Sequence, residues 1–495
     1  MGERPSIVQQ EREPLQDHCG ILAAFSLRGD VPLFHGVIAG LETLQTRGYD
    51  GAGLCAWSTD GNIYTFKGEG IISNIFTPEV KRREMKRSAT LWVAQTRYGT
   101  NGGFTEENIQ PFHINQHSGE FFFVAHNGQF SSTRGNPQIE SDTYLFAKEL
   151  EQSSGGTLDE RILTTVKRKN GAYSLIIGTR NSLYLIRDSR GVRPLVYGEI
   201  KGPSGAPIIV AASETEALIK MGANEFFEVM PGTLVKFMDD QNKTIISLST
   251  KRIPAAACIF ENVYLQDGRS RTLAPRKKLM DINRAPTAIS TRQKAGEILA
   301  REAPLTTDEV DLAIGIPGTG IAGGEAYALF CNIPYFQAIT DKDRQEDQRT
   351  FMSANTDSIL AKVMCHFNFN GKAVSGKRVV LIDDSVVRGN VTLGLIRLLK
   401  ERYGVKEVHL RILSPPIDKT CHLGINTRKN DELIAARHGG NIKQIQKELG
   451  ADSLAYLSGQ GLLEAVSGDP LMKGFCMGCM AGFTHPIDEF GNNVN

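Results

Sequence analysis

The chain has 495 residues, too many for one ordinary hydrophobic core, so two or three domains are expected. It is 41% hydrophobic, and its 56 basic and 55 acidic residues leave a formal charge of +1. This balance gives no electrostatic basis for binding nucleic acid or an anionic membrane, and no apolar run approaches the roughly 20 residues that span a bilayer.

Residues 1–18 are polar and charged, and they lack the apolar middle of a secretory signal peptide. We therefore expect a cytoplasmic protein, in which the eight cysteines serve as thiols, metal ligands or a nucleophile rather than as disulfides. The expected organisation is a leader over 1–18, a first domain over 19–250 and a second domain over 251–495, which includes a C-terminal tail.

The first domain reads as paired strands with interspersed helices, a pattern that predicts a layered α+β fold. Its expected strands cover residues 20–26, 91–95, 120–126, 172–178, 183–187 and 208–212. Its expected helices cover 33–45, 142–152 and 158–168.

After about residue 251, apolar strands alternate with helical patterns, which predicts an α/β domain with a parallel sheet. The expected strands are 312–316, 334–339, 378–382 and 408–413, and the expected helices are 323–330 and 393–402. Ligands of such sheets bind beyond the carboxyl ends of the strands.

One of these strands ends in two adjacent carboxylates, Asp383 and Asp384, followed by a polar loop up to Asn390. Two acids at this place suit the vicinal hydroxyls of a sugar, and free N–H groups at a helix N-terminus suit a phosphate. The pattern therefore predicts a ribose 5-phosphate site. A capped strand end is the alternative, but it explains neither the acidic pair nor the loop.

Cys19 opens the first expected strand, directly after the polar leader. If the leader is removed, Cys19 becomes an N-terminal residue whose thiol can attack a substrate while its own α-amine accepts the proton. The alternative is a buried structural cysteine, which is the commoner situation for a lone Cys-Gly pair.

Four further segments follow Cys19 in a set order, at 44–53, 95–100, 124–128 and 140–143. Together they resemble the glutaminase domain of class II glutamine amidotransferases, whose fold has αββα layers and an N-terminal nucleophile. The resemblance implies that Cys19 attacks the glutamine amide while Asn127 and the Gly128 N–H form an oxyanion hole. It also implies that Arg97 holds the substrate carboxylate and Asp142 its ammonium group.

Each of these residues also has an ordinary interpretation. Asn127-Gly128 is a common hairpin turn, and Arg97 could form a surface ion pair. One departure from the family is Gln95, which stands where a histidine is usual before Thr-Arg. The segment that begins at Arg47 also looks closer to the branch that aminates sugar phosphates.

The second half resembles the type I phosphoribosyltransferase domain of the amidophosphoribosyltransferase family, through segments 258–264, 349–351, 379–391, 407–417 and 453–458. The resemblance implies a reaction of glutamine with phosphoribosyl pyrophosphate in the first step of purine synthesis. Asp383 and Asp384 would bind the ribose hydroxyls and Mg²⁺. The 5-phosphate would be bound by Ser385, Arg388, Gly389 and Asn390. Purine nucleotides as inhibitors and a homodimer or homotetramer are expected as partners, and neither nucleic acid nor a membrane is.

Four cysteines match the cluster ligands of the iron–sulfur branch of this family: Cys258, Cys421, Cys476 and Cys479. Four thiolates from dispersed segments suit a [4Fe–4S] cluster, and structural Zn²⁺ on the same residues is the alternative.

The departures gather in the second half. Residues 341–362 carry extra acids and fewer cations than the loop of the family, Gly318 lies where an acid is usual, and Val391 replaces a threonine. Fewer cations should weaken stabilisation of a pyrophosphate leaving group. The resulting hypothesis is a divergent paralogue that transfers slowly or not at all and acts as a glutaminase, on another phosphosugar, or as a regulatory ligand-binding protein.

Overall fold

The computed structural model describes residues 19–98, 108–115, 120–130, 141–153, 156–203, 205–238, 243–249, 253–273, 282–342, 363–364, 366–425, 427 and 429–487. The expected leader, the domain boundary near residue 250 and nearly all of the 341–362 loop lie outside these ranges. Below, the first half means the described residues up to 249, and the second half means those from 253 onward.

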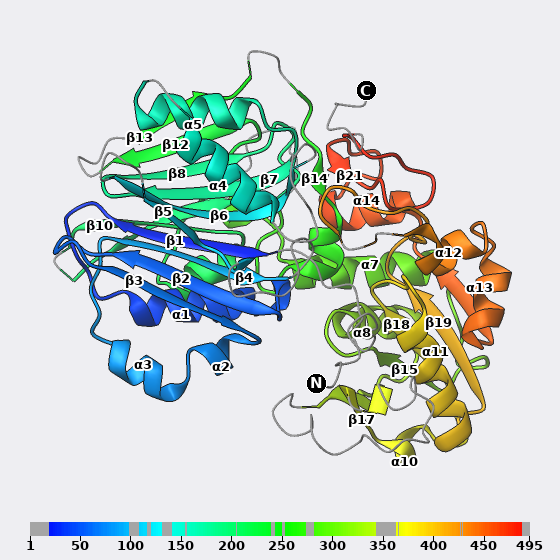
Figure 1. Ribbon diagram of the computed structural model, residues 1–495. Coiled ribbons are helices and arrows are strands. Elements are labelled where there is room, and N and C mark those ends of the chain that lie inside the picture. The colour runs from blue at the N-terminus through cyan, green and yellow to red at the C-terminus, as the bar shows by residue number, and fades with distance from the viewer. Residues whose placement is uncertain are drawn as a thin grey trace, which may run out of the picture.

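The first half contains two antiparallel sheets (Figure 1). The seven-stranded sheet has the order β11-β9-β10-β1-β4-β2-β3, and the six-stranded sheet has the order β13-β12-β8-β7-β6-β5. The larger sheet comprises β1 (Gly20–Ser26), β2 (Gly51–Trp57), β3 (Ile63–Glu69), β4 (Leu91–Arg97), β9 (Val196–Lys201), β10 (Pro207–Ala212) and β11 (Phe226–Glu228). The smaller comprises β5 (Phe112–Asn115), β6 (Phe121–Phe130), β7 (Gly171–Thr179), β8 (Ser182–Arg187), β12 (Thr233–Met238) and β13 (Lys243–Ser247).

Side-chain alternation along the strands produces the layers. Ile21, Ala23 and Phe25 of β1 point into the core between the sheets, where they join Phe121 and Phe123 of β6. The alternate residues of each strand point to the outer face of their sheet, where they pack under helices. The helices on the seven-stranded sheet are α1 (Phe34–Thr43), with the 3₁₀ turn η1 (Leu44–Arg47), α2 (Ile72–Ile75), α3 (Pro78–Glu84) and α6 (Thr215–Lys220). Those on the six-stranded sheet are α4 (Asp142–Gln152) and α5 (Leu158–Lys167). The expected αββα layering is confirmed.

The second half is built on a four-stranded sheet with the order β15-β18-β19-β20, and all its pairs are parallel, as expected. Its strands are β15 (Leu312–Gly315), β18 (Arg378–Asp383), β19 (Glu407–Ile412) and β20 (Ser453–Tyr456). The helices are α7 (Ala288–Glu302), α8 (Gly320–Cys331), α10 (Gly371–Val374), α11 (Asn390–Arg397), α12 (Ile434–Arg437), α13 (Ile442–Leu449) and α14 (Gly459–Ser467). The second half also contains the π-helical segments η3 (Glu261–Leu265) and η5 (Leu398–Arg402) and the 3₁₀ turns η4 (Ile282–Arg284) and η6 (Asn430–Glu432).

The expected strand over 334–339 is wrong. Only Tyr335 bridges to Ala313, and β16 (Ile339–Asp341) pairs instead with β17 (Phe367–Phe369) in an antiparallel ribbon. Pro334 cannot donate to a ladder. The side chain of Gln337 takes the place of a backbone donor from a further strand, because its Nε2 donates to the carbonyl oxygen of Gly315 at 2.8 Å. At this edge of the parallel sheet, a side chain therefore satisfies a carbonyl of β15.

A short parallel pair joins the C-terminal segment to the start of the second half. β14 (Ala257–Cys258) pairs with β21 (Phe475–Cys476), and both lie between the two halves in Figure 1. The Cys258 N–H also donates to the Val192 carbonyl at 3.1 Å. Among the described residues, no helix is long and apolar enough to cross a membrane.

Candidate active sites

Cys19 lies directly before β1 and is partly exposed. The next residues fix the start of the strand: the Gly20 N–H donates to Thr96 Oγ1 at 3.0 Å, and the Ile21 N–H donates to Ser213 Oγ at 3.1 Å. A Cβ at residue 20 would lie 2.7 Å from Leu44 Cβ, so only glycine fits. The thiol is therefore held at a tightly packed strand end that remains open to the surface.

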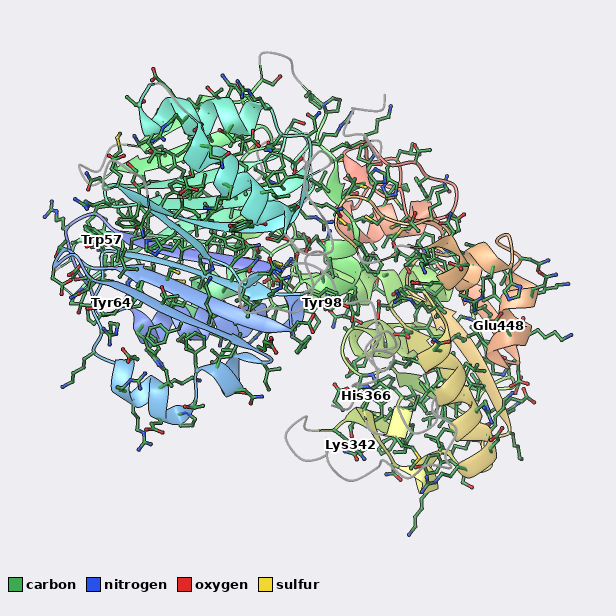
Figure 2. All side chains as sticks on the ribbon, viewed as in Figure 1. Trp57, Tyr64, Tyr98, Lys342, His366 and Glu448 are labelled. Atoms are coloured by element: carbon green, nitrogen blue, oxygen red, sulfur yellow. The ribbon has the colours of Figure 1, made fainter. Side chains whose placement is uncertain are left out.

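Arg97 ends β4 and is buried. Burial lowers the pKa of its guanidinium, and the charges of Cys19, Asp50 and Asp142 oppose that effect, so these groups lie within electrostatic reach of one another. Figure 2 shows the next residue, Tyr98, on the side of the first half that faces the second half, with Trp57 at the opposite end of the sheet. The candidate glutamine site therefore faces the second half.

Asn127 and Gly128 lie inside the ten-residue strand β6, opposite Ser174 and Tyr173 of β7. The hairpin-turn interpretation is therefore wrong. Asn127 is fully buried, its Nδ2 lies 3.5 Å from Ser213 Oγ, and its Oδ1 has no hydrogen-bond partner among the described residues. Gly128 has φ +137°, and a Cβ there would lie 2.0 Å from the Ala172 carbonyl oxygen. A side chain at 128 is thus excluded twice, by conformation and by space.

Asp142 is the first residue of α4, whose N-cap Ser141 accepts a hydrogen bond from the Tyr144 N–H at 3.1 Å. Asp142 Oδ2 accepts from the Phe130 N–H at 3.1 Å, and its Oδ1 lies 3.8 Å from His126 Nδ1. The carboxylate therefore ties the start of α4 to the end of β6, close to Arg97.

A buried polar layer beneath these residues was not identified from the sequence. Gln95, noted only as a departure, donates through Nε2 to the His126 carbonyl at 3.0 Å, and the His126 N–H donates to Gln110 Oε1 at 2.7 Å. Burial lowers the pKa of His126, so the ring is neutral and hydrogen-bonds Thr143 at 2.8 Å. Ser213, 192 residues from Ile21, carried no local signal.

In the second half, Asp383 ends β18, and Asp384 follows it at the carboxyl edge of the sheet. Both oxygens of Asp384 accept hydroxyl hydrogen bonds: Oδ1 from Thr319 at 2.5 Å and Oδ2 from Ser385 at 2.7 Å. Burial and the adjacent charge of Asp384 raise the pKa of Asp383. Burial also raises the pKa of Asp384, against the opposing hydrogen bonds from Thr319 and Ser385.

The loop after the two aspartates leads into α11. Gly389 is the N-cap with φ +85°, and a Cβ there would lie 2.8 Å from Ile434 Cδ1, so the turn requires glycine. Asn390 begins the helix. Arg388 is paired with Glu432, with 2.8 Å between Nη2 and Oε2, so it contacts η6 within the described residues. The arginine named for phosphate binding thus has a carboxylate partner on the protein itself.

The four cysteines Cys258, Cys421, Cys476 and Cys479 gather at the junction of the two halves. Cys258 and Cys476 are in register on β14 and β21. Burial raises the pKa of the Cys258 thiol to about 11, and burial together with Cys421, Cys258 and Cys476 raises that of Cys479. However, no group of three or more His, Cys, Asp or Glu in the described part of the chain could hold a metal ion. Cys55 is buried elsewhere, and Cys365 lies outside the described residues.

No family model matches the chain. The chain is 32% identical to the amidophosphoribosyltransferase of Synechococcus elongatus over 95% of its own length and 92% of that protein. It is 31% identical to that of Bacillus subtilis (98% and 97% covered) and 31% identical to that of Homo sapiens (93% and 91%). A solved structure of glutamine phosphoribosylpyrophosphate amidotransferase from B. subtilis, complexed with ADP and GMP, superposes with a TM-score of 0.80. It is 28% identical, with 96% of this chain and 99% of that one covered.

The αββα layers followed by the parallel-sheet half define a glutaminase fold joined to a phosphoribosyltransferase fold. The identity over nearly the whole chain shows that it belongs to the amidophosphoribosyltransferase family. The resemblance seen in the sequence is confirmed at this level. The assignment to the iron–sulfur branch stays a prediction.

Proposed function

We propose that this chain makes 5-phosphoribosylamine, glutamate and pyrophosphate from glutamine, water and phosphoribosyl pyrophosphate, as a glutamine amidotransferase and glycosyltransferase. The observation that carries the proposal is the joint presence of two sites. Cys19 and Arg97 lie at the same end of the paired strands β1 and β4, where Gly20 is in register with Thr96. Asp383 and Asp384 lie at the carboxyl edge of the parallel sheet in the same chain.

In the glutaminase half, the Cys19 sulfur attacks the amide carbon of glutamine while the α-amine freed by leader removal takes the thiol proton and passes it to the leaving nitrogen. The C–N bond breaks and releases ammonia, and water hydrolyses the resulting thioester to glutamate. The ammonia then displaces pyrophosphate at C1 of the ribose. Asn127 Nδ2 and the Gly128 N–H stabilise the negative oxygen that develops. Arg97 holds the substrate carboxylate as a bidentate fork, and Asp142 holds its ammonium group. The charges of Cys19 and Asp142 both act on the Arg97 guanidinium, which supports this set.

In the second half, Asp383 and Asp384 bind the ribose hydroxyls, and the loop from Ser385 to Asn390 binds the 5-phosphate. The positive φ of Gly389 supports the second assignment, because it turns the chain into the N-terminus of α11. Mg²⁺ would be held by Asp383, Asp384 and substrate oxygens, and would neutralise charge on the pyrophosphate.

We also propose that Cys258, Cys421, Cys476 and Cys479 hold a [4Fe–4S] cluster that pins the C-terminal segment to both halves. The proposal is supported by the register of Cys258 with Cys476 and by the influence of the thiols on one another's pKa. Four thiolates from dispersed segments suit such a cluster, and Zn²⁺ on the same residues is the alternative. Iron and acid-labile sulfide near four per chain, with a brown colour that Cys476→Ser removes, is the expected result. A colourless protein with one zinc per chain would contradict it.

The assay that tests the proposed reaction measures glutamate and pyrophosphate release by the full-length protein. Glutamine or ammonium chloride serves as nitrogen donor, with phosphoribosyl pyrophosphate and Mg²⁺. With glutamine, equal release of glutamate and pyrophosphate is expected, and with ammonium chloride pyrophosphate alone. Cys19→Ala should lose the glutamine-driven reaction and keep the ammonium-driven one, because only the first needs the thiol. Glutamate release without pyrophosphate release under every condition would overturn the proposal.

The same assay tests the hypothesis of a divergent paralogue. That hypothesis rests on the composition of residues 341–362. Of this segment, the structure describes only Asp341 and Lys342. Figure 2 shows Lys342 near His366, whose carbonyl accepts the Lys342 N–H at 2.9 Å. Turnover at ordinary enzyme rates, roughly 1–10³ per second, would exclude a weak transferase.

Regulation, assembly and location remain proposals. The B. subtilis relative was solved with ADP and GMP, which supports purine nucleotides as inhibitors of this chain. Inhibition by either nucleotide in the pyrophosphate assay tests this. Light scattering tests the expected dimer or tetramer, and cell fractionation tests the expected cytoplasmic location.

A further inference from the structure

Four buried charged side chains meet between the two halves: Arg47, Arg193, Glu214 and Glu261. We call them the charge cluster. None is more than 5% exposed. Arg47 ends η1, Arg193 and Glu214 come from loops of the first half, and Glu261 begins η3 of the second half. Two positive and two negative charges balance, as burial requires.

Arg47 is the centre of the charge cluster. Its Nε donates to Glu214, its Nη2 lies 2.7 Å from Glu261 Oε2, and Arg193 Nη1 lies 3.5 Å from Glu261 Oε1. Burial alone would lower the pKa of Arg47, but the charges of Glu214 and Glu261 outweigh it and raise that pKa. Removing one carboxylate would leave a buried guanidinium short of a partner, which is costly.

One arm of the charge cluster leads to the nucleophile and the oxyanion hole. Glu214 follows Ser213, whose Oγ accepts from the Ile21 N–H at 3.1 Å and from Asn127 Nδ2 at 3.5 Å. The Ser213 N–H also donates to the Ile21 carbonyl at 3.0 Å. Because Glu214 is the next residue in the chain, the ion pair between Arg47 and Glu214 also helps to fix Ser213. Ser213 in turn contacts both the start of β1 and Asn127.

The other arm leads to the residue assigned to the glutamine carboxylate. Arg47 precedes Gly48, and a Cβ at 48 would lie 2.5 Å from the Arg97 carbonyl carbon and oxygen. The backbone at Gly48, directly after η1, is thus packed against that of Arg97. On its other side, the carbonyl of Leu44 accepts from Thr96 Oγ1 at 3.1 Å. A shift of Arg47 would therefore move the end of β4.

We propose that Glu261, contributed by the second half, is a positioning residue for the glutamine site in the first half. Through Arg47 it sets the backbone against Arg97, and through Arg47 and Glu214 it sets Ser213 against Asn127. The inference rests on the proposed function for the assignment of the glutamine site. It goes beyond the proposed function because it states that the glutamine site needs a carboxylate from the phosphoribosyltransferase half, Glu261, to be correctly arranged.

The test is Glu261→Gln in the full-length, cofactor-loaded protein, measured by glutamate release over a range of glutamine concentrations. The kcat/KM for glutamine should fall about tenfold or more, because a charged hydrogen-bond partner of Arg47 is lost. Ammonium-driven pyrophosphate release should stay within about twofold of wild type, because that reaction does not use the glutamine site that Glu261 positions. Glu84→Gln is the matched control: Glu84 is also buried and bonded to two arginines, Arg83 and Arg87, but on α3. It should leave both activities unchanged.

Unchanged glutamine kinetics in Glu261→Gln, or an equal loss of the glutamine-driven and ammonium-driven reactions, would overturn the proposal. If Glu261→Gln does not fold, Glu261→Asp keeps the charge but withdraws it by one methylene, and a normal glutamine kcat/KM in that variant would overturn the proposal equally. A wrong proposed function would give a different result, because the wild-type protein would then release no pyrophosphate with either donor. In that case glutamate release can still be measured to compare Glu261→Gln with wild type.

Discussion

Thr319→Val is the sharpest test of the phosphoribosyl site. Thr319 lies in the loop between β15 and α8, and its hydroxyl donates to Asp384 Oδ1 at 2.5 Å. Valine keeps the shape and removes the donor. Asp384 would stay buried and would retain the hydrogen bond from Ser385 on its other oxygen.

The expected size follows from the kind of bond that is lost. A hydrogen bond to a charged group contributes about 1.5–3 kcal/mol, so affinity for the Mg²⁺ complex of phosphoribosyl pyrophosphate should fall roughly 10- to 150-fold. The expected loss of affinity follows from the proposed role, in which an ionised and correctly oriented Asp384 accepts the ribose hydroxyls. Burial already raises its pKa, and Thr319 opposes that rise.

Titration calorimetry of the phosphoribosyl pyrophosphate complex gives the affinity, and glutamate release provides the internal control. Glutaminase activity measured without the phosphosugar should not change, because Thr319 is in the other half. Thr233→Val is the matched control, since that hydroxyl donates to the Met230 carbonyl at 2.7 Å in an exposed turn. Wild-type affinity in Thr319→Val would refute an orienting role for Thr319.

Three more outcomes are expected. Asn127→Ala should lower kcat for glutamate release about 10²- to 10³-fold, as loss of one oxyanion donor does, with ammonium-driven pyrophosphate release retained. Gly296→Ala should destabilise the protein by at least about 1–3 kcal/mol in urea unfolding, because the new Cβ would lie 2.1 Å from the Gly323 carbonyl oxygen. Burial would raise the pKa of Asp30, but hydrogen bonds from Ser58 and Thr90 outweigh burial and lower that pKa. The ionised Asp30 therefore stabilises the fold at pH values above its pKa in the unfolded chain. This stabilisation is lost as the pH falls through its lower pKa in the folded protein. Asp30→Asn should thus cost about 1 kcal/mol at neutral pH, and its urea midpoint should converge with that of wild type in strong acid.

Strong periodic segments were predictable because their pattern is local. The strand expected over 20–26 coincides with β1, and the helix expected over 142–152 coincides with α4. Strands without a clear pattern were missed: β2 contains two glycines, and β3 is only partly buried and lies at the sheet edge, where it pairs with β2. Register with a neighbour, which a single segment does not encode, decided both.

The candidate residues divide in the same way. Cys19 was recognisable from its neighbours, and Asp383 and Asp384 from their place at a strand end. The partners that fix them were not, because Thr319 and Ser213 reach their targets across 65 and 86 residues of chain. A hydroxyl carries no signal of its own when its role depends on which carboxylate or amide packs against it.

By itself, the sequence determined which candidate groups are present: a cysteine before a strand, an acidic pair before a polar loop and four further cysteines in the second half. These depend on residue type and chain direction, which are local. Only the tertiary structure decided how the two halves depend on each other. The balance of charge around Arg47 exists only once Glu214 and Glu261 are buried against it, because desolvation makes each partner necessary to the others.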